Sequence, residues 1–175
     1  MAMPETLMNL AHAPTGPARF RQGMRCLVGS VNVIALQGLE GSLFGVTATA
    51  VCSLSAEPPS LIACVNLKSR LSEALRPGAG FSVNVLATDQ QKIAQAFGGQ
   101  TGVAGVARFA FGEWHRSEHD IPLLAGARAS FECRVAEISD FGSHRTAFGL
   151  VTDVHLGDGT SGSLVFGDGR YGAVA

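Results

Sequence analysis

Two long β-prone runs, residues 128–139 and 144–156, constrain the fold of this chain more than any other feature. Between them lies Asp140-Phe141-Gly142-Ser143, whose residue types are typical of a turn. With the shorter β-prone segments elsewhere, the pattern predicts roughly six or more strands against two or three short helices. We therefore expect a mainly β fold, a small barrel or sandwich with helical decoration.

The remaining strands are expected at short runs of β-branched and apolar residues. Glu57-Pro58-Pro59 closes one of them, because proline cannot donate to a ladder. The strand after it, residues 60–66, is predicted to be fully buried, whereas segment 100–126 has no sustained period and is expected to be a long functional or interface loop. The expected strands are 31–36, 43–55, 60–66, 81–86, 109–114 and 164–166.

Three helices are expected. Pro17 can occupy a first helical turn, and Phe20, Met24 and Leu27 follow at helical spacing, which predicts a helix over about 17–28. Ser69 can cap a helix that ends near Arg76. Thr88 and Gln91 are spaced as a capping box for a helix over 89–97, ended by Gly98-Gly99.

Length and charge limit the function classes. The 175 residues, 46% of them apolar, suit one domain, expected over 17–175 after a flexible lead-in over 1–16. The net charge of −1 offers no basic field for nucleic acid. The chain has no apolar run near the roughly 18 residues of a membrane span and no basic residue before Arg19, so we expect a cytoplasmic protein without membrane contact.

Cysteine and histidine spacing does not indicate a metal centre. Cys26, Cys52, Cys64 and Cys133 form no C-x-x-C pair and are expected to be buried free thiols. His115 and His119 flank Glu118 without matching H-E-x-x-H, and Gly112 and Pro122 favour an exposed loop there. We expect no metal site.

Two glycine motifs match the dinucleotide fingerprint in letters only. Gly157-x-Gly159-x-x-Gly162 lies between expected strands, and Gly167-x-Gly169-x-x-Gly172 has three residues of chain left after it. The fingerprint requires a helix that starts at the glycines, so neither motif is interpreted as a nucleotide site. Asp158-Gly159 and Asp168-Gly169 instead predict hairpin turns.

Two neighbouring segments could hold a ligand. Residues 45–50, followed by Ser53 and Ser55, place small side chains along an extended backbone, where a flat heteroaromatic ring could approach main-chain groups; a solvent-facing strand explains the same residues. Residues 66–70 end a strand and open a helix with an amide, a hydroxyl and two cations, as a phosphate site requires. A plain helix cap with two solvated cations is the alternative.

These segments, taken in order, resemble the flavin reductase-like family of short NAD(P)H:flavin oxidoreductases. The resemblance covers about residues 17–172, and Val33-Ile34-Ala35 departs from it by lacking a threonine after the isoleucine. Its motifs are Phe20-Arg21-x-x-Met24, Gly45-Val46-Thr47-Ala48-Thr49-Ala50-x-x-Ser53-Leu54-Ser55-x-x-Pro58-Pro59, Asn66-x-x-Ser69, Phe81-x-Val83-Asn84-Val85-Leu86, Phe97, Phe111-x-x-Trp114, Pro122-Leu123-Leu124, Gly142-x-His144 and Gly169-Arg170-Tyr171.

The resemblance implies a split β-barrel (Greek key) fold and a homodimer with flavin near the subunit interface. It implies contacts with the isoalloxazine ring and ribityl chain from Thr47, Ala48, Thr49, Ser53, Leu54 and Ser55. It assigns the flavin phosphate to Asn66, Lys68 and Ser69, and the outer end of the flavin to Phe97. His144, Arg170 and Tyr171 match positions on the nicotinamide side, although His144 could equally be a strand histidine beside a turn.

The implied reaction is hydride transfer from NADH or NADPH to FMN, with FAD as a second possibility, and supply of reduced flavin to a partner monooxygenase. Because the cofactor carries the reactive chemistry, no essential acid or base is expected. Two other functions stay open: a corrin-reductase-like flavoprotein that uses tightly bound FMN to reduce another acceptor, and a flavin-binding module without turnover.

Overall fold

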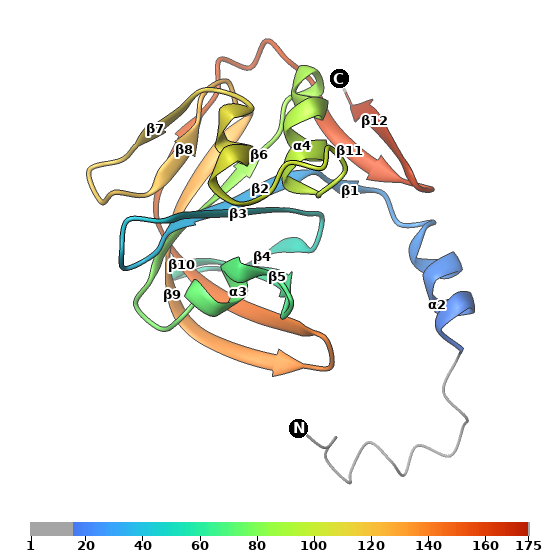
Figure 1. Ribbon diagram of the computed structural model, residues 1–175, viewed down its shortest axis with the longest axis horizontal. Coiled ribbons are helices and arrows are strands. Elements are labelled where there is room, and N and C mark those ends of the chain that lie inside the picture. Colours follow the sequence, from blue (N-terminus) through green and yellow to red (C-terminus); the bar gives the residue numbers. More distant parts are fainter. Residues whose placement is uncertain (1–15, 175) are drawn as a thin grey trace, which may run out of the picture.

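The computed structural model describes residues 16–174, and the expected mainly β fold is confirmed (Figure 1). A seven-stranded antiparallel sheet forms its centre, in the order β3-β2-β6-β9-β10-β5-β4. In chain order these strands are β2 (Asn32–Gln37), β3 (Leu43–Ala48), β4 (Val51–Ala56), β5 (Pro59–Asn66), β6 (Gly80–Val85), β9 (Ala129–Phe141) and β10 (His144–Leu156).

The predicted long hairpin is the β9–β10 pair. Its turn is shorter than expected, because β9 continues to Phe141 and only Gly142 and Ser143 connect the strands. Arg145 forms a bidentate ion pair across the ladder with Asp140, which keeps Asp140 within the strand. The hydrogen bonds from Arg145 hold the pKa of the Asp140 carboxyl below its usual range.

The seven-stranded sheet curls so that its two edge strands meet at one corner. Only Thr49 and Ala50 separate β3 from β4, and the Cys64 N–H donates to the Ala50 carbonyl at 2.9 Å. Within residues 16–174 no ladder joins β3 to β4, so the curled sheet is open along this corner, an arrangement consistent with a split barrel. The prediction of a fully buried strand at 60–66 is wrong, since burial alternates along β5 and one face is partly open.

Smaller sheets cover the ends of the large one. β1 (Gly29–Ser30), β11 (Ser163–Gly167) and β12 (Arg170–Val174) form one, and β7 (Trp114–Arg116) with β8 (Pro122–Leu124) forms another. The prediction of a strand over 109–114 is wrong. The 3-10 helix η2 (Gly105–Ala110) includes the start of this segment, and the next strand starts only at Trp114. Strand β12 (Arg170–Val174) was not among the expected strands.

The two Asp-Gly turns behave differently. Asp168 and Gly169 both have positive φ and join β11 to β12 as a two-residue hairpin, as predicted. Gly159 also has positive φ, but β10 and β11 on either side of it belong to different sheets. The hairpin predicted at Asp158-Gly159 is therefore wrong.

The helices α2, α3 and α4 are shorter than the sequence patterns predicted. α2 (Pro17–Met24) ends before the expected residue 28, and none of its residues is buried, so no packing holds a further turn. α3 (Arg70–Ala74) ends before Arg76 because Leu75 is extended, although its Ser69 cap is confirmed. The 3-10 turn η1 (Thr88–Gln90) leads into α4 (Gln91–Phe97), and the Gln90 side chain, not that of Gln91, accepts from the Ala87 N–H.

Strand β2 separates two apolar cores. Ile34 and Leu36 face the interior of the curled sheet, whereas Val31, just before the strand, and Val33 face a second core under α4. Four free cysteines occupy different environments: Cys133 is buried as predicted, Cys64 is half-buried, and the burial predicted for Cys26 and Cys52 is wrong because both are exposed. Burial, with Glu132 nearby, raises the pKa of Cys133 to about 12.

The expected lead-in over residues 1–16 falls almost wholly outside the described residues. Between residues 16 and 174, no helix has the length and apolarity that a membrane crossing requires.

Candidate functional site

Three adjoining hollows follow strand β3 and share its residues. The central hollow, about 270 Å³, is bounded by Val46–Ala50 of β3 and its turn, Cys64–Asn66 of β5, Ser69 and His144. The basic hollow, about 400 Å³, shares Val46 and Ser69 with it and adds Lys68, Arg70 and Arg108. The tyrosine hollow, about 220 Å³, shares Thr47–Thr49 and adds Gln100, Phe166 and Tyr171. Together they form one groove along β3.

The groove exists because β3 is an edge strand with small residues. On one side its backbone pairs with β2, and on the other side no strand between residues 16 and 174 pairs with it, which leaves backbone donors and acceptors available to a ligand. Thr47 has a structural task as well, because its hydroxyl donates to the Ala94 carbonyl of α4 at 2.7 Å. The segment predicted to accept a flat ring is therefore an open strand edge fixed from behind by α4.

The predicted phosphate residues lie together at the end of β5. The Asn66 side chain accepts from the Lys68 N–H at 2.9 Å, and the Ser69 hydroxyl oxygen accepts from the Ser72 N–H at 3.2 Å, so the helix-cap alternative is correct as local structure. It leaves the Lys68 ammonium without a hydrogen bond or ion pair among residues 16–174. Both sequence interpretations are compatible with this arrangement.

Two arginines add positive charge to the basic hollow. The Arg108 side chain is held by the Val103 carbonyl at 3.1 Å and by the Phe97 carbonyl at 3.4 Å. Arg70 lies over the Phe44 ring, 5.6 Å from its centroid. Neither arginine pairs with a carboxylate within residues 16–174, so this end of the groove is suited to an anion.

His144 reaches the central hollow through strand register. It begins β10 and lies opposite Asn66 of β5, and its Nδ1 is 2.9 Å from the Ser143 hydroxyl. Tyr171 of β12 borders the tyrosine hollow and packs against Phe166, with ring centroids 5.1 Å apart. Burial raises the pKa of the Tyr171 phenol above its ordinary value.

Several expected site residues lie outside the three hollows. Arg170 is exposed beside Asp168 at the β11–β12 turn, with 3.9 Å between guanidinium and carboxylate. Ser53, Leu54 and Ser55 lie on the exposed strand β4, where the Ser55 hydroxyl bonds with the backbone of Glu57. Phe97 is buried behind β3 and packs edge-on against Phe109 at 5.0 Å.

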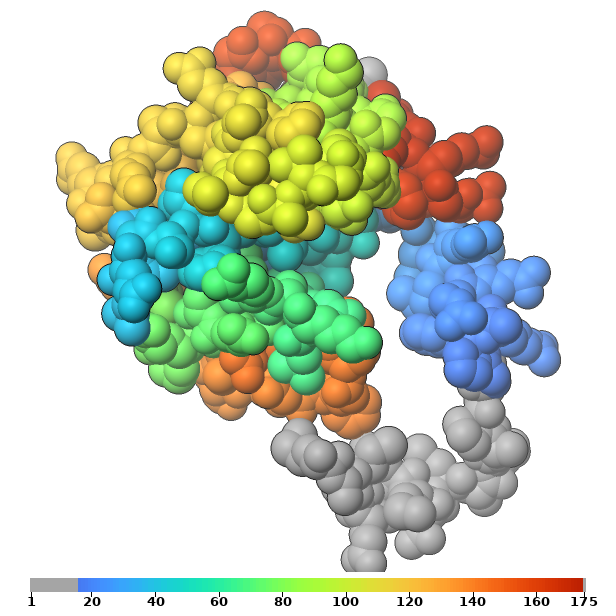
Figure 2. All heavy atoms as spheres, in the orientation of Figure 1, coloured from blue at the N-terminus to red at the C-terminus, as the bar shows by residue number. Residues whose placement is uncertain are grey.

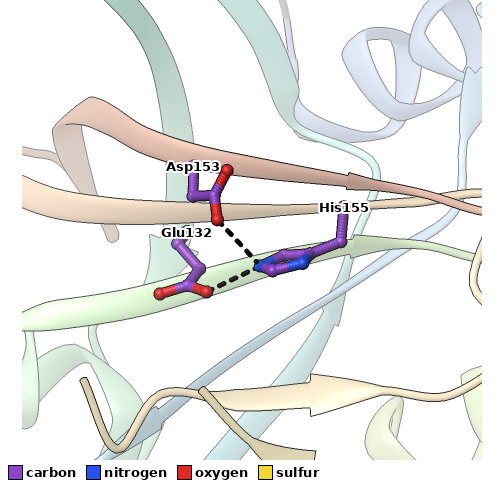
Figure 3. Close-up of side chains that lie close together, drawn as sticks. All are labelled: Glu132, Asp153 and His155. Atoms are coloured by element: carbon purple, nitrogen blue, oxygen red, sulfur yellow. Dashed lines mark hydrogen bonds and ion pairs between the residues drawn. The ribbon is translucent and has the colours of Figure 1, made fainter. Parts of the chain in front are cut away.

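Sequence patterns did not indicate several residues that the fold brings together. Gln100, Arg108 and Phe166 border the groove. Gln100 and Arg108 come from the segment expected to be a long functional or interface loop, and Phe166 comes from the expected strand 164–166, but none was predicted as a site residue. A separate cluster of Glu132, Asp153 and His155 lies on β9 and β10 (Figure 3). Only the cross-strand register of β9 and β10 could have predicted it.

Comparison with known proteins gives one consistent match. The sequence model described as "Flavin reductase like domain" matches residues 24–175. The FMN reductase (NADH) RutF of Ancylobacter novellus is 35% identical over 172 residues, which cover 98% of this chain and 93% of that protein.

Two further relatives agree. The 4-hydroxyphenylacetate 3-monooxygenase reductase component of Pseudomonas aeruginosa is 36% identical over 143 residues, covering 80% of this chain and 84% of that protein. The solved structure of the Streptomyces globisporus NADH:FAD oxidoreductase SgcE6 with NAD and FAD fragments superposes with a TM-score of 0.81 at 25% identity, covering 94% of this chain and 98% of that one.

Proposed function

The chain belongs to the flavin reductase-like family, and from that premise we propose that it transfers hydride from NADH to FMN and supplies the reduced flavin to a partner monooxygenase. The observation that carries this proposal is the groove along β3, where an open strand edge leads into a basic hollow. FMN has a flat ring and a terminal phosphate. The open edge of β3 is suited to the ring, and the basic hollow is suited to the phosphate.

The residues present suit such a cofactor. Thr47, Ala48 and Thr49 offer an edge strand without bulky side chains, and β3 is supported from behind by the Thr47 hydrogen bond to α4. Lys68 and the Ser69 hydroxyl would hold the phosphate, with Arg108 adding charge from across the basic hollow. The bound flavin supplies the hydride acceptor; the protein contributes position.

Residues at the open side of the groove would place the nicotinamide. We assign His144 to this task because it borders the central hollow, and Tyr171 because its phenol borders the tyrosine hollow. Arg170, exposed at the β11–β12 turn, would act on the dinucleotide only from the rim. We choose NADH over NADPH and FMN over FAD for this proposal because the relative that is 35% identical bears the name FMN reductase (NADH), whereas the NADH:FAD oxidoreductase SgcE6 is 25% identical.

We propose that the working unit is a homodimer. α2 stands away from the curled sheet in Figure 2, and its Phe20 and Met24 are 60% and 47% exposed on one helix face. Leu54 is 49% exposed on β4, one of the two edge strands. A second copy that covers these surfaces would bring Ser53, Leu54 and Ser55 toward a flavin at the interface.

The free cysteines suit a reducing compartment, so the cytoplasm is the proposed location.

Anaerobic NADH oxidation by the purified full chain tests this function. The assay is run first without flavin and then with excess FMN, FAD or riboflavin. We expect many turnovers, in proportion to added FMN. One equivalent of oxidation that ignores added flavin would mean that the flavin stays bound and serves another acceptor, and retained FMN without any NADH oxidation would leave only a binding module.

A further inference from the structure

A buried carboxylate lies between basic and acidic side chains at the far end of the β9–β10 hairpin. Glu132 of β9 contacts His155 of β10, with 2.7 Å between Oε1 and Nε2. Asp153 approaches the same nitrogen, with 3.5 Å between its Oδ2 and Nε2 (Figure 3). Donor atoms of all three side chains lie within 4.8 Å of one another.

A bulge in the hairpin creates this arrangement. The β9–β10 register shifts between Val151 and Asp153, after which Asp153 stands directly opposite Glu132. Like charges opposite each other on a sheet destabilise it, and a cation between them removes that repulsion. The bulge therefore faces two carboxylates toward one imidazole nitrogen.

The second observation is an oxygen without a hydrogen bond. The Glu132 side chain is 3% exposed, and its Oε2 is fully buried and accepts no hydrogen bond. The His119 Nδ1, on the β7–β8 hairpin, is 3.5 Å from this oxygen. Burial of an unsatisfied carboxylate oxygen is costly, and a cation bound beside Glu132 would reduce that cost.

We propose that Glu132, Asp153 and His155 bind one divalent metal ion of the zinc type, with His119 or water in the fourth position. Carboxylate oxygen and imidazole nitrogen are zinc ligands, and tetrahedral coordination places such donor atoms about 3.3 Å apart. The Asp153–His155 contact, at 3.5 Å, is close to this separation. The Glu132–His155 contact, at 2.7 Å, is a hydrogen bond that must lengthen when the metal binds. Mg²⁺ prefers oxygen alone and is not expected to bind.

This site is distinct from the groove. His155 and His144 lie toward opposite ends of β10, and His144 alone borders a hollow of the groove. With His119 as fourth ligand, the metal would connect the β7–β8 hairpin to the main sheet, a stabilising role that does not depend on the proposed reductase activity.

The test is a Zn²⁺ titration of the full chain after removal of metals with a chelator. We expect one equivalent to bind, and Mg²⁺ not to compete. Asp153→Asn and His155→Gln, both at partly exposed side chains, should each weaken binding roughly tenfold or more. His115→Gln is the matched control, because His115 lines the same neighbouring cavity as His155 but is not one of the three ligands.

Co²⁺ in place of Zn²⁺ separates this site from the exposed thiols of Cys26 and Cys52. The proposal expects a Co²⁺ spectrum without a thiolate charge-transfer band. Three results would each overturn it. The first is that the parent chain binds no Zn²⁺, the second is that the Asp153→Asn and His155→Gln variants bind Zn²⁺ as tightly as the parent does, and the third is a thiolate band that accounts for all of the bound metal. Thermal unfolding of each variant with a chelator present verifies that its fold is intact.

Discussion

Lys68 and Ser69 differ in their contacts within the fold. Ser69 caps α3, so its replacement disturbs the helix as well as any ligand. The Lys68 ammonium has no partner between residues 16 and 174 and is free to meet a phosphate. Lys68 is therefore the cleaner probe of the basic hollow.

Lys68→Ala should weaken FMN binding roughly tenfold to a hundredfold, the effect of losing a charged hydrogen bond of about 1.5–3 kcal/mol. Riboflavin, which lacks the phosphate, should bind equally well to both proteins. Quenching of flavin fluorescence measures both affinities. Lys92→Ala, at an exposed lysine of α4 outside the groove, is the matched control. Equal losses for FMN and riboflavin would contradict a phosphate site at Lys68.

His144→Ala should lower kcat/KM for NADH roughly tenfold while the Kd for FMN changes by less than about twofold. The reason is its place at the rim of the central hollow, where it would orient the nicotinamide rather than hold the flavin. Steady-state kinetics with each substrate varied in turn measures the difference. Unchanged constants for both substrates would remove His144 from the site.

For single residues, the sequence predicted the roles that depend on neighbours in the chain. It did not predict the roles that depend on contacts between distant parts of the chain. The Ser69 cap follows from spacing and is present. The Thr47 hydrogen bond to Ala94 joins residues 47 positions apart, and no local pattern indicates it. The ligand roles of Thr47, Ala48, Thr49, Asn66, Lys68 and Ser69 stay predictions that the groove supports.

Among elements, the contact of β3 with α4 determines the shape of the groove. Gly45 makes this contact possible, because a Cβ there would lie 2.5 Å from the Phe97 ring and 3.3 Å from that of Phe109. The buried ring of Phe97 packs against the partly buried rings of Phe109 and Trp114, which limits its movement away from β3. The close approach therefore requires glycine.

Gly45→Ala should destabilise the protein by about 1–3 kcal/mol, since overpacking a tight contact displaces side chains or backbone. For a chain of this length the melting temperature should fall by about 2–4 °C for each kcal/mol. Gly172→Ala is the control, because its Cβ would meet Val165 at an ordinary 3.5 Å. Calorimetry that finds the two variants equally stable would show that β3 and α4 tolerate separation.

The long elements were predictable and the short ones were not. β9 and β10 carry patterns long enough to identify, and the turn between them is marked by glycine. β7 and β8 have three residues each, too few for a period, and exist because they pair with each other. β12 has only five residues, and the Asp168-Gly169 hairpin brings them beside β11.

At the scale of the whole molecule, the exposed apolar side chains of α2 have no explanation in the contacts that residues 16–174 of a single chain make. None of its residues is buried, its Phe20 and Met24 are 60% and 47% exposed, and Figure 2 shows it standing away from the curled sheet. Burial of such residues stabilises association, and a second copy is the occupant that the proposed dimer provides.

Light scattering after gel filtration should give a mass of about twice 18.1 kDa. Phe20→Ser should shift the protein toward the monomer without unfolding it, because α2 buries no residue in the single chain. Leu39→Ser removes an equally apolar and more exposed side chain in the β2–β3 turn and should leave the mass unchanged. A parent chain that is monomeric at assay concentration would contradict the dimer.

The assembly of the groove could be predicted only in part. Its sequence segments 45–50 and 66–70 were identified, but their meeting with Tyr171 and Arg108 depends on the curl of the sheet and on the path of residues 98–110. The Glu132 cluster depends on a bulge, which no pattern in the sequence marks. That residues 17–175 form a single domain stays a prediction.

The central claim is that FMN lies in the groove along β3, and a crystal structure of the protein with FMN tests it most directly. The account predicts the isoalloxazine ring against Thr47–Thr49 and the phosphate within hydrogen-bond distance of Lys68 and Ser69. FMN bound elsewhere on the protein, or with its phosphate away from the basic hollow, would contradict the account.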